Sequence, residues 1–359
     1  MRWHGPGSIA VTFCTFYPDL VISRRGGTIM AESPTIQMQP MLSFSNMVRI
    51  FGWSVLAILA VFLVNNFLNY GADYPGAAAA LGEQATLSAM LQLAAYPLGV
   101  VVASAHVLRS AGTSLRSDGA RISNINTFLI RAAFWTVLIV GVADLVVSFM
   151  RVEDLLQGVV GEQLTKDLGR SQFRGLYMHV PLIAFSIVLA AFTRTLGFHW
   201  LALLIVAAEL GIVIMRFVFS YEQAFMSDLV RFWYGALFLF ASAYTLLEEG
   251  HVRVDVFYAS FTTKTKSVVN AVCTISMGLT FCWTILIVGM GQKTSIINSP
   301  VLNFETTQAG FGMYVKYMMA GFLGIFAISM MIQFVSYLMA AVADYRGEPG
   351  SRVIAEPTM

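Results

Sequence analysis

Long apolar stretches alternate with short polar segments along the chain. Because the hydrocarbon core of a bilayer is about 30 Å thick, a helix that crosses it needs about 20 apolar residues. The stretches that satisfy this requirement are residues 49–70, 85–108, 127–150, 176–193, 199–219, 229–247, 267–290 and 312–343. The pattern therefore predicts an all-α membrane protein with eight transmembrane helices.

The last stretch is longer than a single crossing requires. At a rise of about 1.5 Å per residue, a helix over residues 312–343 exceeds the thickness of the hydrocarbon core. We expect this helix to tilt or to project beyond the bilayer.

Composition agrees with a membrane protein and argues against a nucleic-acid-binding surface. Hydrophobic residues make up 57% of the 359 residues and charged residues only 12%, against about 25% charged residues in soluble domains. The 22 basic and 20 acidic residues leave a formal net charge of +2, which is no basic footprint for nucleic acid. We expect membrane lipid, and no nucleic acid, among the partners.

The placement of lysine and arginine predicts the orientation, because short loops rich in these residues stay in the cytoplasm. With the N-terminus inside, most basic residues fall in inner segments, among them Arg109, Arg116, Arg121, Lys264 and Lys266. The outer segments hold Lys293 and, in one longer loop, Arg151, Lys166, Arg170 and Arg174. Both termini are therefore predicted to be cytoplasmic.

The longer outer loop carries a helical pattern of its own. Apolar residues recur there at 3.6-residue spacing with acidic and amide residues between them; they are Val152, Leu155, Leu156, Val159, Val160 and Leu164. This pattern indicates a helix that lies flat in the outer interface or one that packs on neighbouring loops.

Ionisable side chains inside the bilayer are costly unless they are paired, so each is a candidate for function. Glu209 and Arg216 lie seven residues apart on one helix face, where they can bracket a shared partner. Asp228 and Arg231 are three residues apart and can pair on one helix surface. The plainer interpretation is that these four residues pair between helices and fix the register of a bundle.

Three further charges lie within the predicted spans. Asp144 and Arg131 are thirteen residues apart, too far to meet along one helix, so each needs another partner. Lys316 lies near the outer end of the last span, from which its side chain can extend to the interface.

Motifs for catalysis do not occur in the sequence, and we expect no enzyme. There is no ATP-binding loop, nucleophile elbow or zinc-protease helix. A haem held by two histidines is an alternative for a membrane bundle. His106 and His179 are predicted at opposite membrane surfaces, which leaves His106 with His199 as the pair for such a haem.

The C-terminal spans carry motifs of a known family. A span ending in MRFVF is followed by SDLVRFWYGALFLFASAYTLLEEGHVRVDVFY and two more spans. The order resembles the small membrane subunit, called DctQ or the Q subunit, of tripartite ATP-independent periplasmic (TRAP) transporters. The matching positions are Arg216 with Phe217, Asp228 with Arg231, and residues 250–255. Most members lack four preceding spans, so these form an N-terminal extension here.

The resemblance implies an organisation and a set of partners. Residues 1–46 are then a cytoplasmic segment, residues 47–196 the four-helix extension, residues 197–345 the DctQ-like four-helix domain and residues 346–359 a cytoplasmic tail. The family implies a large DctM-like membrane subunit and a periplasmic substrate-binding protein as partners, in the bacterial inner membrane. It implies sodium-coupled uptake of an organic acid, with sodium in the large subunit and no cofactor in this one.

The polar stretch at the inner end of the sixth span fits such an assembly. Gly250 can end the span, and valines alternate with Arg253 and Asp255 beyond it. We hypothesise that a polar lock ties this span to neighbouring helices or to the large subunit; its residues are Glu248, His251, Arg253 and Asp255. The alternative is a solvated turn that obeys the positive-inside bias.

Two other classes of function stay open at this point. A stand-alone transporter or channel would transport its substrate without any partner. A haem-bearing anchor of a membrane oxidoreductase would show a Soret absorption band in the purified protein.

Synthesis is predicted to begin at Met30. The preceding residues mix proline, glycine and aromatic residues without the pattern of a signal peptide, and codons for Arg24 and Arg25 can form a ribosome-binding sequence. We expect intact-mass measurement of the natural protein to give a species that begins at Met30. A species that contains residues 1–29 would contradict this start.

Overall fold

Membrane-length helices dominate the computed structural model, which describes residues 43–82, 85–194, 198–221, 224–247, 258–306 and 312–351. Eight of the helical segments in these ranges are long and apolar enough to cross a membrane, which confirms the predicted fold class. Six of them are single helices, and five of these six are α1 (Phe44–Gly71), α2 (Leu87–Arg109), α3 (Leu115–Val152), α8 (Phe198–Phe219) and α13 (Lys316–Tyr345).

Of the other three spans, one is the sixth single helix and two are interrupted by a π-helical segment. The fourth comprises α6 (Ser171–Arg174), the π-helical turn η2 (Gly175–His179) and α7 (Val180–Phe192). The sixth is α9 (Ala224–Leu247), and the seventh comprises α10 (Thr263–Cys273), the π-helical segment η4 (Thr274–Leu279) and α11 (Thr280–Met290). The connections contain η1 (Ala77–Leu81), α4 (Leu156–Val160), α5 (Glu162–Leu168), η3 (Tyr258–Ser260) and α12 (Asn298–Asn303).

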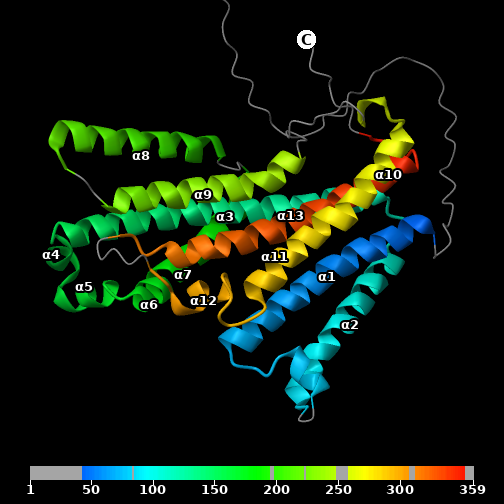
Figure 1. Ribbon diagram of the computed structural model, residues 1–359, viewed down its shortest axis with the longest axis horizontal. Coiled ribbons are helices and arrows are strands. Elements are labelled where there is room, and N and C mark those ends of the chain that lie inside the picture. The colour runs from blue at the N-terminus through cyan, green and yellow to red at the C-terminus, as the bar shows by residue number, and fades with distance from the viewer. Residues whose placement is uncertain are drawn as a thin grey trace, which may run out of the picture. The chain divides into compact units, whose positions relative to one another are not determined.

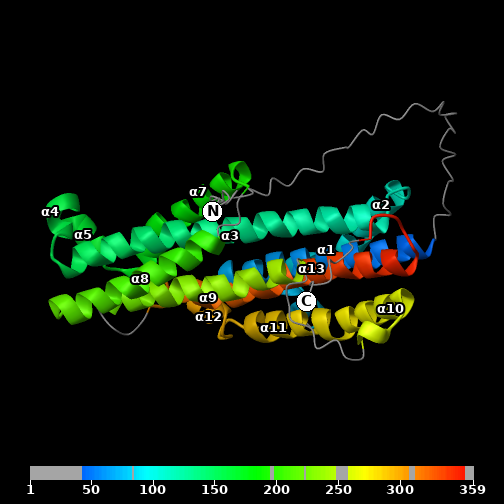
Figure 2. The ribbon, with the colours of Figure 1, turned by 90° about the horizontal axis from the view of Figure 1, so that it is seen from above.

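The two longest helices, α3 and α13, lie side by side and organise the bundle (Figures 1 and 2). Helix α9 packs against both of them, and α7 packs against α3. Helices α1, α10 and α11 pack against α13, while α2 packs on α1 and α8 packs on α9. Helices from both predicted four-span groups are therefore interleaved, although the division near Gly197 stays a prediction.

Aromatic side chains fill the space between α3, α9 and α13. The ring of Phe240 on α9 lies 5.8 Å from that of Phe134 on α3 and 5.0 Å from that of Phe322 on α13, between ring centroids. Phe232 lies 5.1 Å from Phe322. Phe232 and Phe240 are fully buried, and such pairs contribute beyond the area they bury. The core therefore joins the extension to the C-terminal helices.

Helix α3 begins twelve residues earlier than the predicted span 127–150, at Leu115. These first turns are polar, so a prediction from hydropathy alone leaves them out of the span. Their side chains find partners on neighbouring helices: Arg116 Nη2 lies 2.6 Å from Asp344 Oδ1, and Asn126 Nδ2 donates to Gln333 Oε1 at 3.2 Å, both on α13. Packing on α13 therefore extends α3 beyond its apolar part.

A buried ion pair fixes the same end of the bundle to α1. Arg49 and Asp118 have no solvent exposure, and Arg49 Nε donates to Asp118 Oδ2 at 2.7 Å. Arg49 also donates to the Ser110 carbonyl oxygen at 2.9 Å, and Trp53 Nε1 donates to Asp118 Oδ2 at 3.1 Å. This is the end of the bundle where α1 begins and α13 ends.

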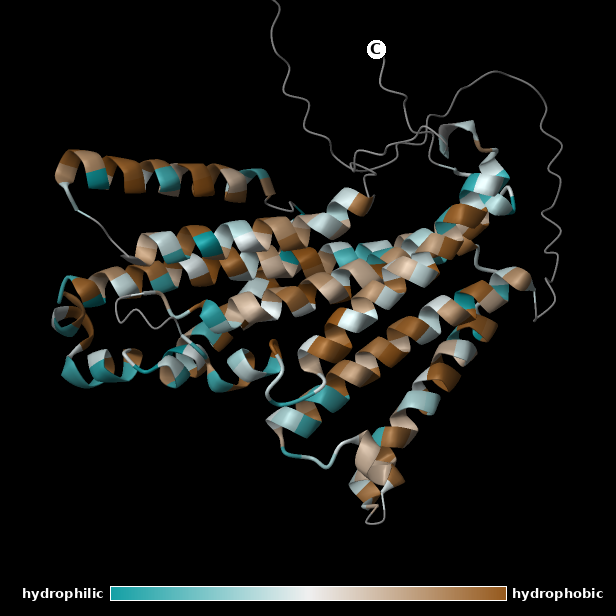
Figure 3. Cartoon of the chain, in the orientation of Figure 1, coloured by the Kyte–Doolittle hydropathy of each residue, from teal (hydrophilic) through white to brown (hydrophobic). Residues whose placement is uncertain are grey.

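The amphipathic helix predicted in the longer outer loop is broken into pieces. Helix α3 continues to Val152, and two short helices, α4 and α5, follow it. Gly161 separates them with φ of +83°, a left-handed conformation that glycine adopts without strain. One continuous helix over this pattern is therefore wrong; Leu156 alone of the pattern is fully covered, whereas Leu155 and Val159 are exposed. Figure 3 shows this region as largely hydrophilic.

Close approach of α3 and α9 requires a glycine at position 141. A Cβ atom there would lie 2.5 Å from Nε1 of Trp233, which donates to the Val137 carbonyl oxygen at 3.3 Å. We expect Gly141→Val to lower the stability of the protein by about 1–3 kcal/mol, the usual cost of overpacking. Thermal unfolding in detergent measures this loss.

The matched control is Gly211→Val on α8, because no atom lies within 4 Å of a Cβ placed there. Its melting temperature should equal that of the natural protein. Equal melting temperatures for the two variants would contradict the assignment of α3 and α9 as a tightly packed pair.

Candidate functional site

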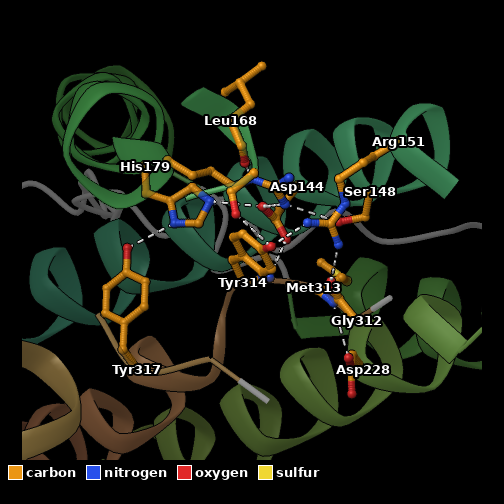
Figure 4. A network of polar contacts seen from close by, with 12 residues as sticks. Asp144, Ser148, Arg151, Leu168, His179, Asp228, Gly312, Met313, Tyr314 and Tyr317 are labelled. Carbon is orange, nitrogen blue, oxygen red and sulfur yellow. Dashed lines mark hydrogen bonds and ion pairs between the residues drawn. The ribbon is translucent and has the colours of Figure 1, made fainter. Parts of the chain in front are cut away.

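Asp144 on α3 is the centre of a polar cluster whose innermost charged side chains are fully buried (Figure 4). Its Oδ1 atom accepts from Arg174 Nη1 at 3.0 Å and lies 3.1 Å from His179 Nε2. Its Oδ2 atom accepts the backbone N–H of Tyr314 at 2.8 Å. The side chains of Asp144, Arg174 and His179 have no solvent exposure. An aspartate inside a membrane span is thus paired on both oxygens.

The fourth span brings the two basic partners to Asp144. Arg174 ends α6, and His179 ends the π-helical turn that follows. A π-helical turn holds one residue more than an α-helical turn, and such turns are frequent at functional sites. Gly175 is the first residue of this turn. A residue with a Cβ atom does not fit there, because that atom would clash with the Phe304 ring.

His179 connects the cluster to α13. Its Nδ1 atom lies 2.8 Å from the Tyr317 hydroxyl, and the two rings stack with centroids 5.9 Å apart. A neutral imidazole with its proton on Nε2 satisfies both contacts, since it donates to Asp144 and accepts from Tyr317. The Tyr317 ring also contacts Phe304, with 5.1 Å between centroids.

The segment over residues 312–315, just before α13, is held by two carboxylates. The consecutive N–H groups of Met313 and Tyr314 donate to Asp228 Oδ2 at 3.1 Å and to Asp144 Oδ2 at 2.8 Å. Asp228 lies on α9 and Asp144 on α3, so the segment bridges two helices. The predicted last span begins at residue 312, whereas α13 begins at Lys316, directly after this bridging segment.

Two arginines enclose the Tyr314 side chain. The guanidinium carbon of Arg174 lies 4.1 Å from the ring centroid and that of Arg151 lies 4.7 Å from it. The Tyr314 hydroxyl donates to the Gly169 carbonyl oxygen at 2.9 Å and accepts from Arg151. Cation–π contacts of this kind strengthen when water is excluded. They offset part of the cost of burying the two cations.

The arrangement is suited to holding helices together. Two carboxylates, Asp144 and Asp228, and two guanidinium groups, Arg174 and Arg151, make up the cluster, so its formal charges balance as a buried charged network requires. The acceptors and donors come from α3, α6, η2, α9 and the segment before α13. The cluster therefore ties the N-terminal extension to the C-terminal spans. In the described ranges, no three His, Cys, Asp or Glu side chains lie close enough to hold a metal ion.

The predicted candidates on α8 lie away from this cluster. Glu209 is exposed near the middle of α8 and makes no hydrogen bond or ion pair among the residues that the structure describes. Arg216 is also exposed and, with Tyr221 and Ser227, lines a cavity of about 150 Å³ beside α8 and α9.

The structure places the other candidates as follows. Asp228 Oδ1 lies 4.0 Å from Arg231 Nη1, so the predicted contact on one helix surface is present. Lys316 Nζ contacts Glu305 Oε1 at 2.5 Å, with both side chains partly exposed. The polar-lock residues Glu248, His251, Arg253 and Asp255 lie outside the described ranges, and the lock stays a prediction.

The sequence does not identify the partners of Asp144 and Arg131, and the structure does. Arg131 Nη1 donates to the Ala190 carbonyl oxygen at the end of α7, at 3.4 Å. Arg174 is the missed partner of Asp144, since sequence reasoning placed it with the solvated charges of the outer loop. Its position directly before a predicted span, opposite a span with an unpaired aspartate, was the signal available.

The histidines proposed for haem lie in different helix pairs. His106 on α2 packs its ring against Trp53 of α1, with 5.2 Å between centroids. His199 is exposed at the start of α8. Figure 1 shows α2 and α8 well apart. The structure therefore does not bring these two rings together.

Comparison with known proteins gave one family match. Residues 201–344 match the family model described as "Tripartite ATP-independent periplasmic transporters, DctQ component". These residues include most of α8 and nearly all of α13, with α9, α10 and α11 between them. Searches of curated proteins and of solved structures gave no match.

Removing the Asp144 carboxylate should destabilise the bundle strongly. Asp144→Leu leaves Arg174 buried without its counter-charge, and breaking a buried pair in this way costs about 3–5 kcal/mol. The double variant Asp144→Leu/Arg174→Met should recover much of this loss, because the uncompensated charge is gone. Thermal unfolding in detergent compares the variants.

The control is Glu162→Gln, which removes one carboxylate from an ion pair with Lys166 at the surface. Exposed pairs of this type contribute little, so no change in melting temperature is expected. A double variant less stable than Asp144→Leu alone would contradict the buried pair as the cause.

Proposed function

We propose that the whole chain acts as the small membrane subunit of a TRAP transporter, because residues 201–344 match the model of the DctQ component family. The observation that carries the proposal is the coincidence of the family match with four membrane-length helical segments in the C-terminal part of the chain. The members of the DctQ family are transporter components and not enzymes.

The proposed subunit works with two partners. A periplasmic binding protein delivers an organic acid to a large membrane subunit, which carries it across the bacterial inner membrane with sodium. The sodium sites belong to the large subunit, and this chain contributes no cofactor. In this arrangement both termini face the cytoplasm, and the end of the bundle that holds Asp144 faces the periplasm.

The proposed role of this chain is to provide a fixed surface in the membrane. A transport domain that moves across the bilayer needs a neighbour that does not move with it. The polar contacts between α3 and α13, together with the Asp144 cluster, support such a role because they oppose sliding of the helices. The extension then enlarges this fixed body, since α3 packs against both α9 and α13.

Co-expression with the neighbouring genes tests the proposal. We expect a tag on this chain to recover a large multi-span protein in stoichiometric amount. The complex, reconstituted in liposomes, should take up the organic acid that stabilises the co-encoded binding protein against heat. Uptake should require the binding protein and an inward sodium gradient.

Liposomes that hold this chain alone provide the control and should show no uptake. Transport by the chain alone would favour a self-contained transporter. Sodium-independent uptake by the full complex would contradict sodium coupling while leaving the subunit assignment in place.

A further inference from the structure

Helix α8 is the least buried of the eight candidate spans and carries a regular apolar face. It packs against α9, and its α9-facing side includes the buried residues Leu201 and Ala208. On the other side, exposed apolar residues recur at alternating spacings of three and four: Leu203, Val206, Leu210, Val213 and Phe217. This heptad spacing is the one by which helices pack side by side at a small crossing angle.

An apolar face alone indicates nothing in a membrane, because lipid chains cover it as well as a protein would. The carboxylate beside it is different. Glu209 is three residues after Val206 and four before Val213, so it flanks the heptad face. In helical pairs this flanking position carries the charged side chains that select the partner.

Glu209 has no means of satisfying its charge within the described chain. It is exposed and makes no hydrogen bond or ion pair there. It lies about 15 Å from either end of α8 at the rise of an α-helix, too far for a glutamate side chain to reach the membrane surface. Figure 3 shows the helix around it as mainly hydrophobic. A carboxylate at this depth requires a donor from outside the described chain.

We propose that the heptad face of α8 docks a transmembrane helix of the large subunit, and that a lysine or arginine of that helix pairs with Glu209. This rests on the proposed function, because it assumes that a large membrane subunit is present. A cationic side chain complements the negative charge of Glu209. Exclusion of water by the apolar face strengthens the attraction between the two charges.

A second copy of this chain fits the face less well. Copies inserted in one membrane share the same orientation, so two α8 helices related by a twofold axis along the membrane normal would run parallel. In such a parallel pair a residue at this flanking position lies beside the partner residue five positions further on, so Glu209 would meet the apolar Ile214 of the second copy and gain no counter-charge. The charge therefore favours a different protein as the occupant.

Recovery of the large subunit through a tag on this chain tests the pairing. Glu209→Leu and Glu209→Lys should each lower recovery roughly tenfold or more, since one partner of a buried charge pair is lost. Their melting temperatures as isolated chains should stay unchanged, because Glu209 has no partner within the described chain. Glu162→Gln, which removes an exposed carboxylate outside α8, should leave recovery unchanged.

Photo-crosslinking identifies the occupant directly. A benzoylphenylalanine at Leu210, on the heptad face, should crosslink to the large subunit, whereas one at Leu204, which packs against the core, should not. Crosslinks from Leu210 to a second copy, or to lipid only, would overturn the proposal. Full recovery with both Glu209 variants would also overturn it and leave the proposed function intact. Failure of the natural chain to recover any large subunit would instead overturn the proposed function.

Discussion

The Asp144 carboxylate is the group on which much of this structure depends. A charge inside a membrane span must be neutralised by neighbours, and here the neighbours come from two separate parts of the chain: Arg174 and His179 of the fourth span, and the N–H of Tyr314 just before α13. Each contact restricts one element. Together they set the depth of the fourth span against α3 and attach the segment before α13 to α3.

The extension and the family-matched region form one packed body. Phe134 on α3 lies among aromatic rings of α9, and the polar first turns of α3 bond to the end of α13. Separating the extension from the family-matched region would expose apolar surface to lipid, which costs little. It would also leave buried charges without partners. Polar contacts therefore account for the cohesion of the bundle more than apolar burial does.

The membrane spans were predictable because hydropathy is a local property of about 20 consecutive residues. All eight predicted spans are present, and the contact between Asp228 and Arg231 followed from their spacing alone. The errors occur where distant partners decide the conformation. Polar residues such as Arg116 extend α3 because α13 satisfies them, and Gly161 interrupts a pattern that apolar spacing alone read as one helix.

The sequence by itself determined the fold class, the number of spans and the match of residues 201–344 to the DctQ family model. Only the tertiary structure decided which charges are partners. It buried Arg174 beside Asp144, buried Arg49 beside Asp118, and left Glu209 exposed. The physical reason is that helix formation in a membrane follows from the local cost of unpaired backbone groups, whereas pairing of charges depends on which helices pack together at the same depth.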